Sequence, residues 1–161
     1  MVVLAPEHAV GLFDALDDHR VGTYIGGPDV TTLEALEDRI RRVAAGPPPG
    51  TGERWCNWVV MLGSRVIGRL EATLHDGIAE IAYVFSPSTW GHGYAAEAVR
   101  WLLIELRGAR VAAVWATVDP ENVASIGLLR RLGFQPSAAP REDLRSFDPG
   151  DEVYSVLLGR R

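Results

Sequence analysis

Hydrophobic and polar positions along the chain follow two periods, and the change from one to the other separates helices from strands. Apolar residues first recur at helical spacing after Pro6, a residue that suits the first turn of a helix. A second helical pattern follows Thr31 and stops before Gly46 and three prolines. We expect Thr31 to cap this second helix, with Glu34 reaching back to complete a capping box.

From Trp55 onward the pattern becomes that of β-strands. Three β-rich runs cover residues 55–62, 66–74 and 78–85, and an Asp-Gly pair between the last two is a strong hairpin signal. These runs predict an antiparallel meander. The elements predicted after it are a helix over about 94–106, a strand over 111–118, a helix from Asp119 to Gly133, a short strand from Phe134 and a last strand over 152–158, with a stub strand at 2–4 near the start of the chain.

Composition and charge limit the class of protein. The 161 residues are enough for one domain with a proper core and too few for two, so we expect a single domain over residues 1–161. No apolar run approaches the ~18–20 residues that span a bilayer, and the N-terminus lacks the basic head of a signal peptide. The lone cysteine, Cys56, fits a reducing compartment, so we expect a cytoplasmic protein without a membrane partner.

The remaining composition argues against two kinds of partner. A net charge of −5 does not suit a nucleic-acid binder, which needs a basic face to meet phosphates. The four histidines are scattered along the chain, and no metal-ligand spacing is found, so we expect no bound metal.

A glycine-rich loop between a strand and a helix carries the strongest chemical signal. Gly91 and Gly93 stand directly before the predicted helix start at Tyr94, and the small residue Ala95 follows. The first turn of a helix has N–H groups without an internal partner, and its dipole makes that end positive. Glycines let a ligand approach this backbone closely, so the loop predicts a cradle for a phosphate or pyrophosphate.

Three interpretations of the loop compete. Glycines before a helix often form an ordinary turn. Residues 91–96 also fit the dinucleotide pattern G-x-G-x-x-A, but that pattern needs a tight turn inside a parallel β-α-β unit, whereas this loop follows a meander and contains Pro87. The third interpretation is a resemblance to a family. Residues 90–95, Trp-Gly-His-Gly-Tyr-Ala, resemble the pyrophosphate loop R/Q-x-x-G-x-G/A of the GNAT superfamily of N-acetyltransferases.

Two further features support this resemblance and indicate a branch of the family. Trp90 stands at the R/Q position, and Glu97-Ala98 follows the loop, as in the branch that includes the ribosomal-protein N-terminal acetyltransferases. Residues 118–134 resemble the family's N-x-x-S/A segment that ends in Gly-Phe. The resemblance covers roughly residues 55–134 and implies the GNAT-like, acyl-CoA N-acyltransferase fold. This fold is α+β, with a mixed, mostly antiparallel sheet of about six to seven strands flanked by four helices.

The resemblance also implies an acetyl-CoA site. In the family, the end of the fourth strand pairs with the pantetheine arm, which requires that strand to part from the strand predicted at 111–118. The implied cofactor-binding residues are Tyr83, Val84 and Phe85 on the strand, Trp90, Gly91, His92, Gly93, Tyr94 and Ala95 in the loop, and Asn122 at a helix start. The alternative for Asn122 is a plain helix cap, but we expect Asp119 to be the cap.

The reaction implied by the resemblance moves an acetyl group to a primary amine of a protein N-terminus, an amino acid or a small molecule. Many family members carry a tyrosine acid in the last helix, but the aligned residue here is Leu129. Ser125 is the candidate to stabilise the departing sulfur, with close packing as the alternative. Glu80, an acid amid apolar neighbours on a strand, is the candidate base, with Glu71 and His75 as alternates.

Some questions stay open from the sequence. The missing tyrosine acid keeps a second hypothesis, a GNAT-like module that binds an acyl-CoA without transferring the acyl group. We expect the first two helices and the loops at 47–53 and 136–150 to build the acceptor site. Its candidate lining residues are Trp55, Trp58 and Phe147, but core packing explains Trp55 and Trp58 better. The last strand has no assigned neighbour and is available to pair across a homodimer.

Overall fold

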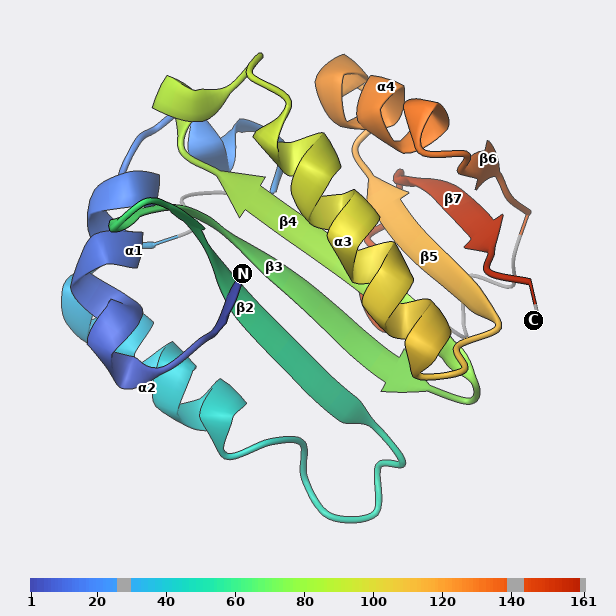
Figure 1. The fold of residues 1–161 in the computed structure, drawn as a ribbon, viewed down its shortest axis with the longest axis horizontal. Coiled ribbons are helices and arrows are strands. Elements are labelled where there is room, and N and C mark those ends of the chain that lie inside the picture. The colour runs from blue at the N-terminus through green and yellow to red at the C-terminus, as the bar shows by residue number, and fades with distance from the viewer. Residues whose placement is uncertain (26–29, 139–143, 160–161) are drawn as a thin grey trace.

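A single seven-stranded sheet organises the computed structural model, which describes residues 1–25, 30–138 and 144–159 (Figure 1). The strands lie in the order β1-β2-β3-β4-β5-β7-β6. The strands are β1 (Val2–Val3), β2 (Arg54–Leu62), β3 (Arg65–His75), β4 (Ile78–Phe85), β5 (Ala113–Val118), β6 (Gln135–Pro136) and β7 (Glu152–Leu157). The helices are α1 (Ala9–Leu16), α2 (Leu33–Ala44), α3 (Tyr94–Gly108) and α4 (Val123–Arg131), with 3-10 turns η1 (Pro6–His8), η2 (Val21–Tyr24) and η3 (Pro87–Thr89).

These elements confirm the predicted fold class. Strands β2, β3 and β4 form the expected antiparallel meander, and the stub strand pairs with β2. The part of the predicted 136–150 loop that falls on residues 139–143 lies outside the described residues.

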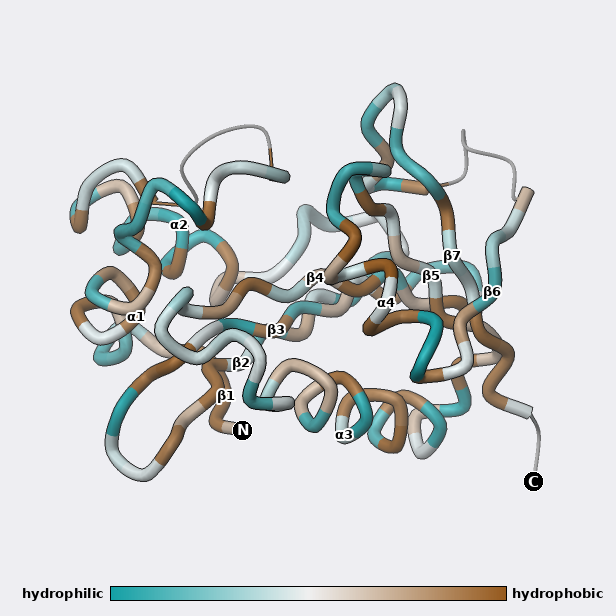
Figure 2. The backbone as a smooth tube through the Cα atoms, turned by 90° about the horizontal axis from the view of Figure 1, so that it is seen from above, coloured by the Kyte–Doolittle hydropathy of each residue, from teal (hydrophilic) through white to brown (hydrophobic). Residues whose placement is uncertain are grey.

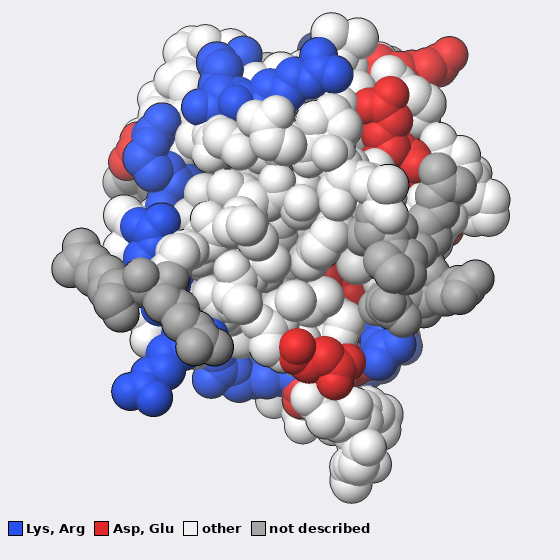
Figure 3. All heavy atoms as spheres, turned by 90° about the vertical axis from the view of Figure 1, so that its right-hand side faces the viewer, with Lys and Arg blue, Asp and Glu red and all other residues white. Residues whose placement is uncertain are grey.

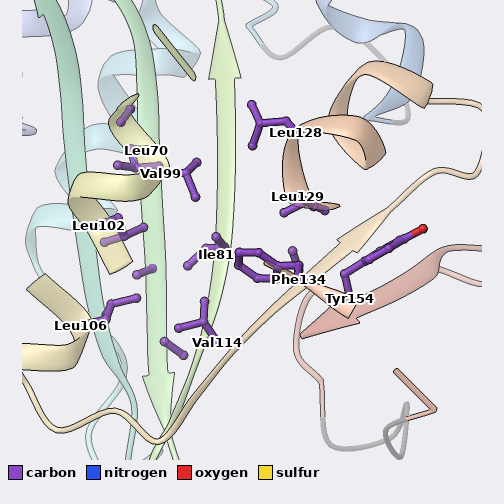
Figure 4. Close-up of a cluster of buried hydrophobic side chains, with 14 of the residues drawn as sticks. Leu70, Ile81, Val99, Leu102, Leu106, Val114, Leu128, Leu129, Phe134 and Tyr154 are labelled. Atoms are coloured by element: carbon purple, nitrogen blue, oxygen red, sulfur yellow. The ribbon is translucent and has the colours of Figure 1, made fainter. Parts of the chain in front are cut away.

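Helices cover both faces of the sheet, with α1 and α2 on one side and α3 on the other (Figure 2). The main core forms where α3 and α4 meet the sheet. Figure 4 shows Val99, Leu102 and Leu106 of α3 directed toward Leu70 and Ile81, which come from β3 and β4. A second cluster joins α1 and α2 to the opposite face. The central strands therefore bury apolar side chains on both faces.

The sheet opens between β4 and β5. The two strands run parallel, but their pairing ends with Glu80 opposite Trp115, after three residue pairs. Beyond this point the arrows of β4 and β5 diverge in Figure 1, and α4 lies over the open end. The second half of β4 therefore keeps a backbone edge that β5 does not use. This is the separation that the family resemblance requires.

A buried aromatic ring supports the opening from the core side. Phe134 follows α4 and has no exposed surface. Figure 4 shows its ring between Ile81 of β4 and Tyr154 of β7, with Leu129 above and Val114 below. The ring therefore fills the space between α4 and the separating strands.

Two predictions of local structure were wrong. Thr32 caps α2, because the helix begins at Leu33 and the Thr32 hydroxyl accepts a hydrogen bond from the N–H of Ala35 at 3.1 Å. Thr31 lies one residue outside the helix. The expectation that the last strand has no neighbour was also wrong, because β7 lies between β5 and β6 and pairs with both. Pairing with β6 covers two residue pairs, and the homodimer stays a prediction.

Arginine is the only basic side chain of this protein apart from histidine. All 16 residues in the combined Lys and Arg count are arginines, and the sequence contains no lysine. Figure 3 shows arginines along the top, left and lower margins of one face and acidic residues at its upper right and lower margins, around a largely uncharged centre. None of the described helices is long and apolar enough to cross a membrane.

Candidate active site

A cavity of about 550 Å³ lies where β4 and β5 diverge. Its walls come from the end of β4, the loop before α3, the first turn of α3, one face of α4 together with its N-cap, and the segment around η2. The volume is in the range of small-molecule sites in proteins. Of the predicted cofactor-binding residues, all but His92 line it.

The start of α3 opens onto this cavity. Its N-cap is Gly93, which has a φ of +83° and no side chain to accept hydrogen bonds from the first turn. The N–H groups of Tyr94, Ala95 and Ala96 therefore lack the usual cap, and all three residues line the cavity. A Cβ placed on Gly91 or Gly93 would meet nothing within 4 Å, so the space in front of this backbone is clear. The geometry is that of an anion site.

Side chains of the loop hold its shape. The indole Nε1 of Trp90 donates to the carbonyl of Phe85 at 2.8 Å, which ties the loop to the last residue of β4. The ring of His92 stacks on Tyr94 and places its Nδ1 2.8 Å from the Trp90 carbonyl. The tryptophan at the R/Q position thus anchors the loop, and the imidazole of His92 acts inside the loop. The imidazole of His92 is engaged inside the loop, so the backbone of this residue is the group that would contact a cofactor. This contact stays a prediction.

The first turn of α4 forms another wall. The Oδ1 of Asn122 accepts from the N–H of Ser125 at 3.0 Å, so Asn122 is the N-cap. The prediction that Asp119 caps this helix was wrong, because its carboxylate accepts from Glu121 in the turn before the helix starts. Asn122 lines the cavity as well. Capping uses only its oxygen, so the amide Nδ2 is left to meet a ligand.

Two hydroxyls meet in the cavity wall. The hydroxyl of Tyr83 on β4 lies 2.7 Å from the Oγ of Ser125 on α4. Burial raises the pKa of Tyr83 to about 12, against the opposing effects of the Ser125 hydrogen bond and the charge of Arg131. The phenol therefore keeps its proton at neutral pH. Leu129 is buried in the core, so the family's tyrosine position supplies no hydroxyl here.

Glu80 lies at the point where β4 and β5 part and does not line the cavity. Its carboxylate contacts His75 Nε2 at 2.6 Å and accepts from the N–H groups of Arg145 and Ser146 and from the Ser146 hydroxyl, at 2.8, 2.9 and 2.6 Å. Burial alone would raise the pKa of Glu80, but these hydrogen bonds outweigh burial and hold it below its ordinary value. The geometry favours a role in pinning residues 145–146, and the assignment as base stays a prediction.

The alternate bases are also engaged. The carboxylate of Glu71 accepts from Arg39 Nη2 at 2.8 Å and forms an ion pair with Arg69. His75 is buried between Glu80 and Asp76, with its Nδ1 3.2 Å from the Asp76 carboxylate. Neither residue lines the cavity.

The predicted acceptor residues do not reach this cavity. Trp58 packs edge to face on Trp101 at 5.4 Å in the main core. The indole of Trp55 donates to Glu53 at 2.9 Å, and Glu53 also accepts from Arg145 at 3.1 Å. These contacts connect the loop at 47–53 to residue 145.

Sequence reasoning missed two parts of the cavity. The segment around η2 contributes Tyr24 and Ile25, and no periodic pattern in the sequence marks it. Arg131 had a usable signal, because it follows Ser125 and Leu128 at three-residue spacing along one face of α4.

Replacing Glu80 by glutamine should lower stability more than activity. Glutamine keeps one acceptor oxygen and turns an N–H₂ toward the donors of residues 145–146. We expect the free energy of unfolding to fall by about 2–4 kcal/mol, since hydrogen bonds to charged groups contribute ~1.5–3 kcal/mol each. We expect kcat to fall less than tenfold, whereas loss of a general base costs about 10²–10⁴-fold. Denaturant unfolding and steady-state kinetics of Glu80→Gln measure the two effects.

The pH dependence of stability provides a second readout for this variant. A carboxyl whose folded-state pKa is lowered stabilises the fold above its unfolded-state pKa, about 4.3 for glutamate. That contribution is lost as the pH falls through the folded-state pKa. The stability advantage of the wild type over Glu80→Gln should therefore be full at neutral pH and shrink below about pH 4. An advantage that persists unchanged at low pH would contradict the pinning role.

No group of three or more His, Cys, Asp or Glu residues able to hold a metal ion occurs within the described ranges.

Comparisons with known proteins agree with this geometry. A family model for the acetyltransferase (GNAT) domain matches residues 1–135. A relative from Bacillus licheniformis, named uncharacterized N-acetyltransferase p20, is 30% identical over 148 residues, which cover 89% of this chain and 83% of the relative.

Solved structures share the fold over nearly the whole chain. A putative acetyltransferase from T. thermophilus has a TM-score of 0.74 and 26% identity, and the match covers 96% of this chain and 83% of that one. The ribosomal L7/L12 α-N-protein acetyltransferase RimL, in complex with coenzyme A, has a TM-score of 0.78 over 97% of this chain and 92% of its own. At 14% identity, RimL supports the fold alone.

Proposed function

This chain belongs to the GNAT acetyltransferase family and is an N-acetyltransferase, and from that premise we propose that it acetylates the α-amine of a protein, peptide or amino acid with acetyl-CoA. The observation that carries the proposal is the glycine N-cap of α3, which turns free N–H groups into a cavity beside the open edge of β4. A helix start of this kind binds phosphate, and a free strand edge binds an extended amide chain. Acetyl-CoA contains both groups.

The residues around the cavity fit the parts of this substrate. The N–H groups of Tyr94, Ala95 and Ala96 suit the pyrophosphate, and the backbone of residues 83–85 suits the pantetheine arm. Arg131 adds positive charge to the cavity wall, and its planar guanidinium is well matched to phosphate. When bound, acetyl-CoA supplies the thioester that the amine attacks.

The protonation state of the amine favours an α-amine as acceptor. A lysine-like amine of pKa ~10.4 costs about 4–5 kcal/mol to deprotonate at pH 7, whereas an α-amine of pKa ~7.7–8.0 costs only about 1 kcal/mol. The carboxylates of Glu80 and Glu71 are both held by hydrogen bonds or ion pairs. An acceptor that needs only water as base therefore fits this site better than one that needs a strong base.

The remaining steps fall to backbone and hydroxyl groups. A backbone N–H near Phe85 is suited to polarise the thioester carbonyl, as in an oxyanion hole. The Ser125 hydroxyl is suited to donate a hydrogen bond to the sulfur when the bond between carbon and sulfur breaks. A thiol of pKa ~8.5 is a good leaving group, so one such donor is sufficient help.

A matched pair of peptides tests the acceptor. One peptide has a free α-amine and arginine in place of lysine, and the other is Nα-acetylated with a single lysine. We expect thiol release from acetyl-CoA to be at least about tenfold faster with the free α-amine at pH 7. Faster reaction of the lysine peptide contradicts the α-amine preference, and absence of acetyl-CoA binding in calorimetry contradicts the cavity assignment.

Leu129 is the observation that supports a second candidate function, the binding of an acyl-CoA without transfer. Because the family's tyrosine position is apolar and buried, the chain has the cavity of an acyl-CoA site without that acid. The alternative is a binding module that holds an acyl-CoA without transfer. Acetyl-CoA binding together with no thiol release across a broad panel of amines would favour this alternative.

We also propose a cytoplasmic location. The single Cys56 is half-buried against the main core, and burial raises the pKa of its thiol, so it stays protonated and unreactive. A protein with one inert thiol fits a reducing compartment. Fractionation of producing cells tests the location directly.

A further inference from the structure

The hydrogen bond between Tyr83 and Ser125 joins two elements that are otherwise separated by the opening of the sheet. Tyr83 lies on β4, Ser125 lies 42 positions later on α4, and their hydroxyl oxygens are 2.7 Å apart. Both residues line the cavity. The pair therefore joins two sides of the cavity wall. The proposed function places the thioester end of acetyl-CoA beside this part of the wall.

The surroundings decide which hydroxyl donates. The ring of Tyr83 packs against the main core, and its hydroxyl has Ser125 as the one partner found among the described residues. A buried phenol with one available acceptor donates its proton to that acceptor, because an unmade hydrogen bond is costly there. Ser125 Oγ then accepts, and its own proton is free to rotate into the cavity.

The backbone of Ser125 is held as well. Its N–H donates to the Oδ1 of Asn122, which fixes the residue in the first turn of α4. With the backbone set by Asn122 and one lone pair of Oγ occupied by Tyr83, the remaining proton of Ser125 has a restricted range of directions.

We propose that Tyr83 is a positioning residue of the transfer reaction, which turns the proton of Ser125 toward the leaving sulfur by donating to Ser125 Oγ. This inference rests on the proposed function. The amine attacks the thioester carbonyl, and the bond between carbon and sulfur breaks with its electron pair moving to sulfur. Ser125 donates a hydrogen bond to this thiolate and keeps its proton. The proton lost by the amine passes to water, and the thiolate takes one from water.

The arrangement supports the Ser125 hydroxyl of α4 with a second hydroxyl from the sheet. Leu129 occupies the family's tyrosine position in the core, while Tyr83 approaches from β4 and acts through Ser125. A purely structural hydrogen bond between the two elements would affect stability but would not change the charge state of a bound thiol.

Titration of bound coenzyme A tests the inference without any acceptor. The ultraviolet absorbance of the thiolate, followed against pH in the saturated complex, gives the apparent pKa of the bound thiol. We expect Ser125→Ala and Tyr83→Phe each to raise that pKa by about one unit, a tenfold loss of thiolate at a given pH. The double variant should match Ser125→Ala alone, because Tyr83 acts through Ser125.

Kinetics of acetyl transfer provide the second readout. We expect kcat of Tyr83→Phe to fall about tenfold with little change in KM for acetyl-CoA, and the same substitution to have no further effect in the Ser125→Ala background. Tyr154→Phe is the matched control, because the Tyr154 hydroxyl bonds to Arg130 and Glu152 away from the cavity. This control should leave both the thiol pKa and kcat unchanged.

Two results would overturn the inference. One is an unchanged thiol pKa in Tyr83→Phe when calorimetry shows that coenzyme A still binds and thermal unfolding shows a folded protein. The other is a full effect of Tyr83→Phe in the Ser125→Ala background. If the wild type binds coenzyme A but transfers no acetyl group, the proposed function fails and the role of Tyr83 in transfer fails with it, while the titration still shows separately whether Tyr83 acts on the bound thiol through Ser125.

Discussion

Replacing Gly93 by alanine should weaken acetyl-CoA binding by roughly 10–100-fold. A residue with a side chain pays about 1–2 kcal/mol to adopt a left-handed conformation such as the φ of +83° found here. The new methyl group would also point into the clear space in front of the first turn of α3. Both effects act on the N–H groups that face the pyrophosphate, so the dissociation constant from calorimetry should rise by this factor.

Gly108 offers a matched control for this substitution. It lies at the end of the same helix, away from the cavity, and a Cβ there meets nothing within 4 Å. Alanine at this position should leave acetyl-CoA binding unchanged and keep or slightly raise stability, since alanine favours helix. Equal loss of binding in both variants would mean that the glycine loop is not the anion site.

Replacing Phe134 by alanine should destabilise the protein by about 3–5 kcal/mol, as is usual for a large aromatic side chain removed from a core. Phe134 is fully buried between α4 and the separating strands. For a chain of this length, such a loss lowers the melting temperature by roughly 6–20 °C. Thermal and denaturant unfolding measure it.

The size of the effect should follow the size of the cavity left behind. Phe134→Leu keeps much of the volume and should cost about 1–2 kcal/mol. Since the ring also supports the wall formed by α4, Phe134→Ala should weaken acetyl-CoA binding at temperatures where the variant is still folded. A loss of stability below about 1 kcal/mol in Phe134→Ala would contradict its role as the support of the opening.

The strands and the glycine loop could be predicted because their signals are local. The β-rich runs and the Asp-Gly turn predicted the meander of β2, β3 and β4, and the resemblance carried by the loop and the segment at 118–134 implied the correct fold class. The position of β7 could not be predicted, because pairing between β5 and β7 is set by contacts far apart in sequence. The cap of α4 was misassigned because Asp119 and Asn122 are both good cap residues, and only the real start of the helix distinguishes them.

The parts of the candidate site that are formed by backbone could be predicted from the sequence, and the side-chain contacts could not. Loop residues from Trp90 to Ala95 were found from their pattern, whereas side-chain partners depend on three-dimensional contacts. The carboxylate of Glu80 looked like a base amid apolar neighbours, but residues 145–146 supply donors that no local pattern associates with it. In the same way, nothing in the sequence pairs Tyr83 with Ser125.

The absence of lysine from the chain has a practical consequence for the search for the natural acceptor. Because the chain contains no lysine, it offers acetyl-CoA no ε-amine of its own. A lysine that receives a labelled acetyl group from acetyl-CoA in a cell extract therefore belongs to another protein, and self-acetylation of this chain is limited to its own α-amine. For the same reason, amine-reactive labels modify a bound peptide through its amines and leave the arginine side chains of this protein unmodified.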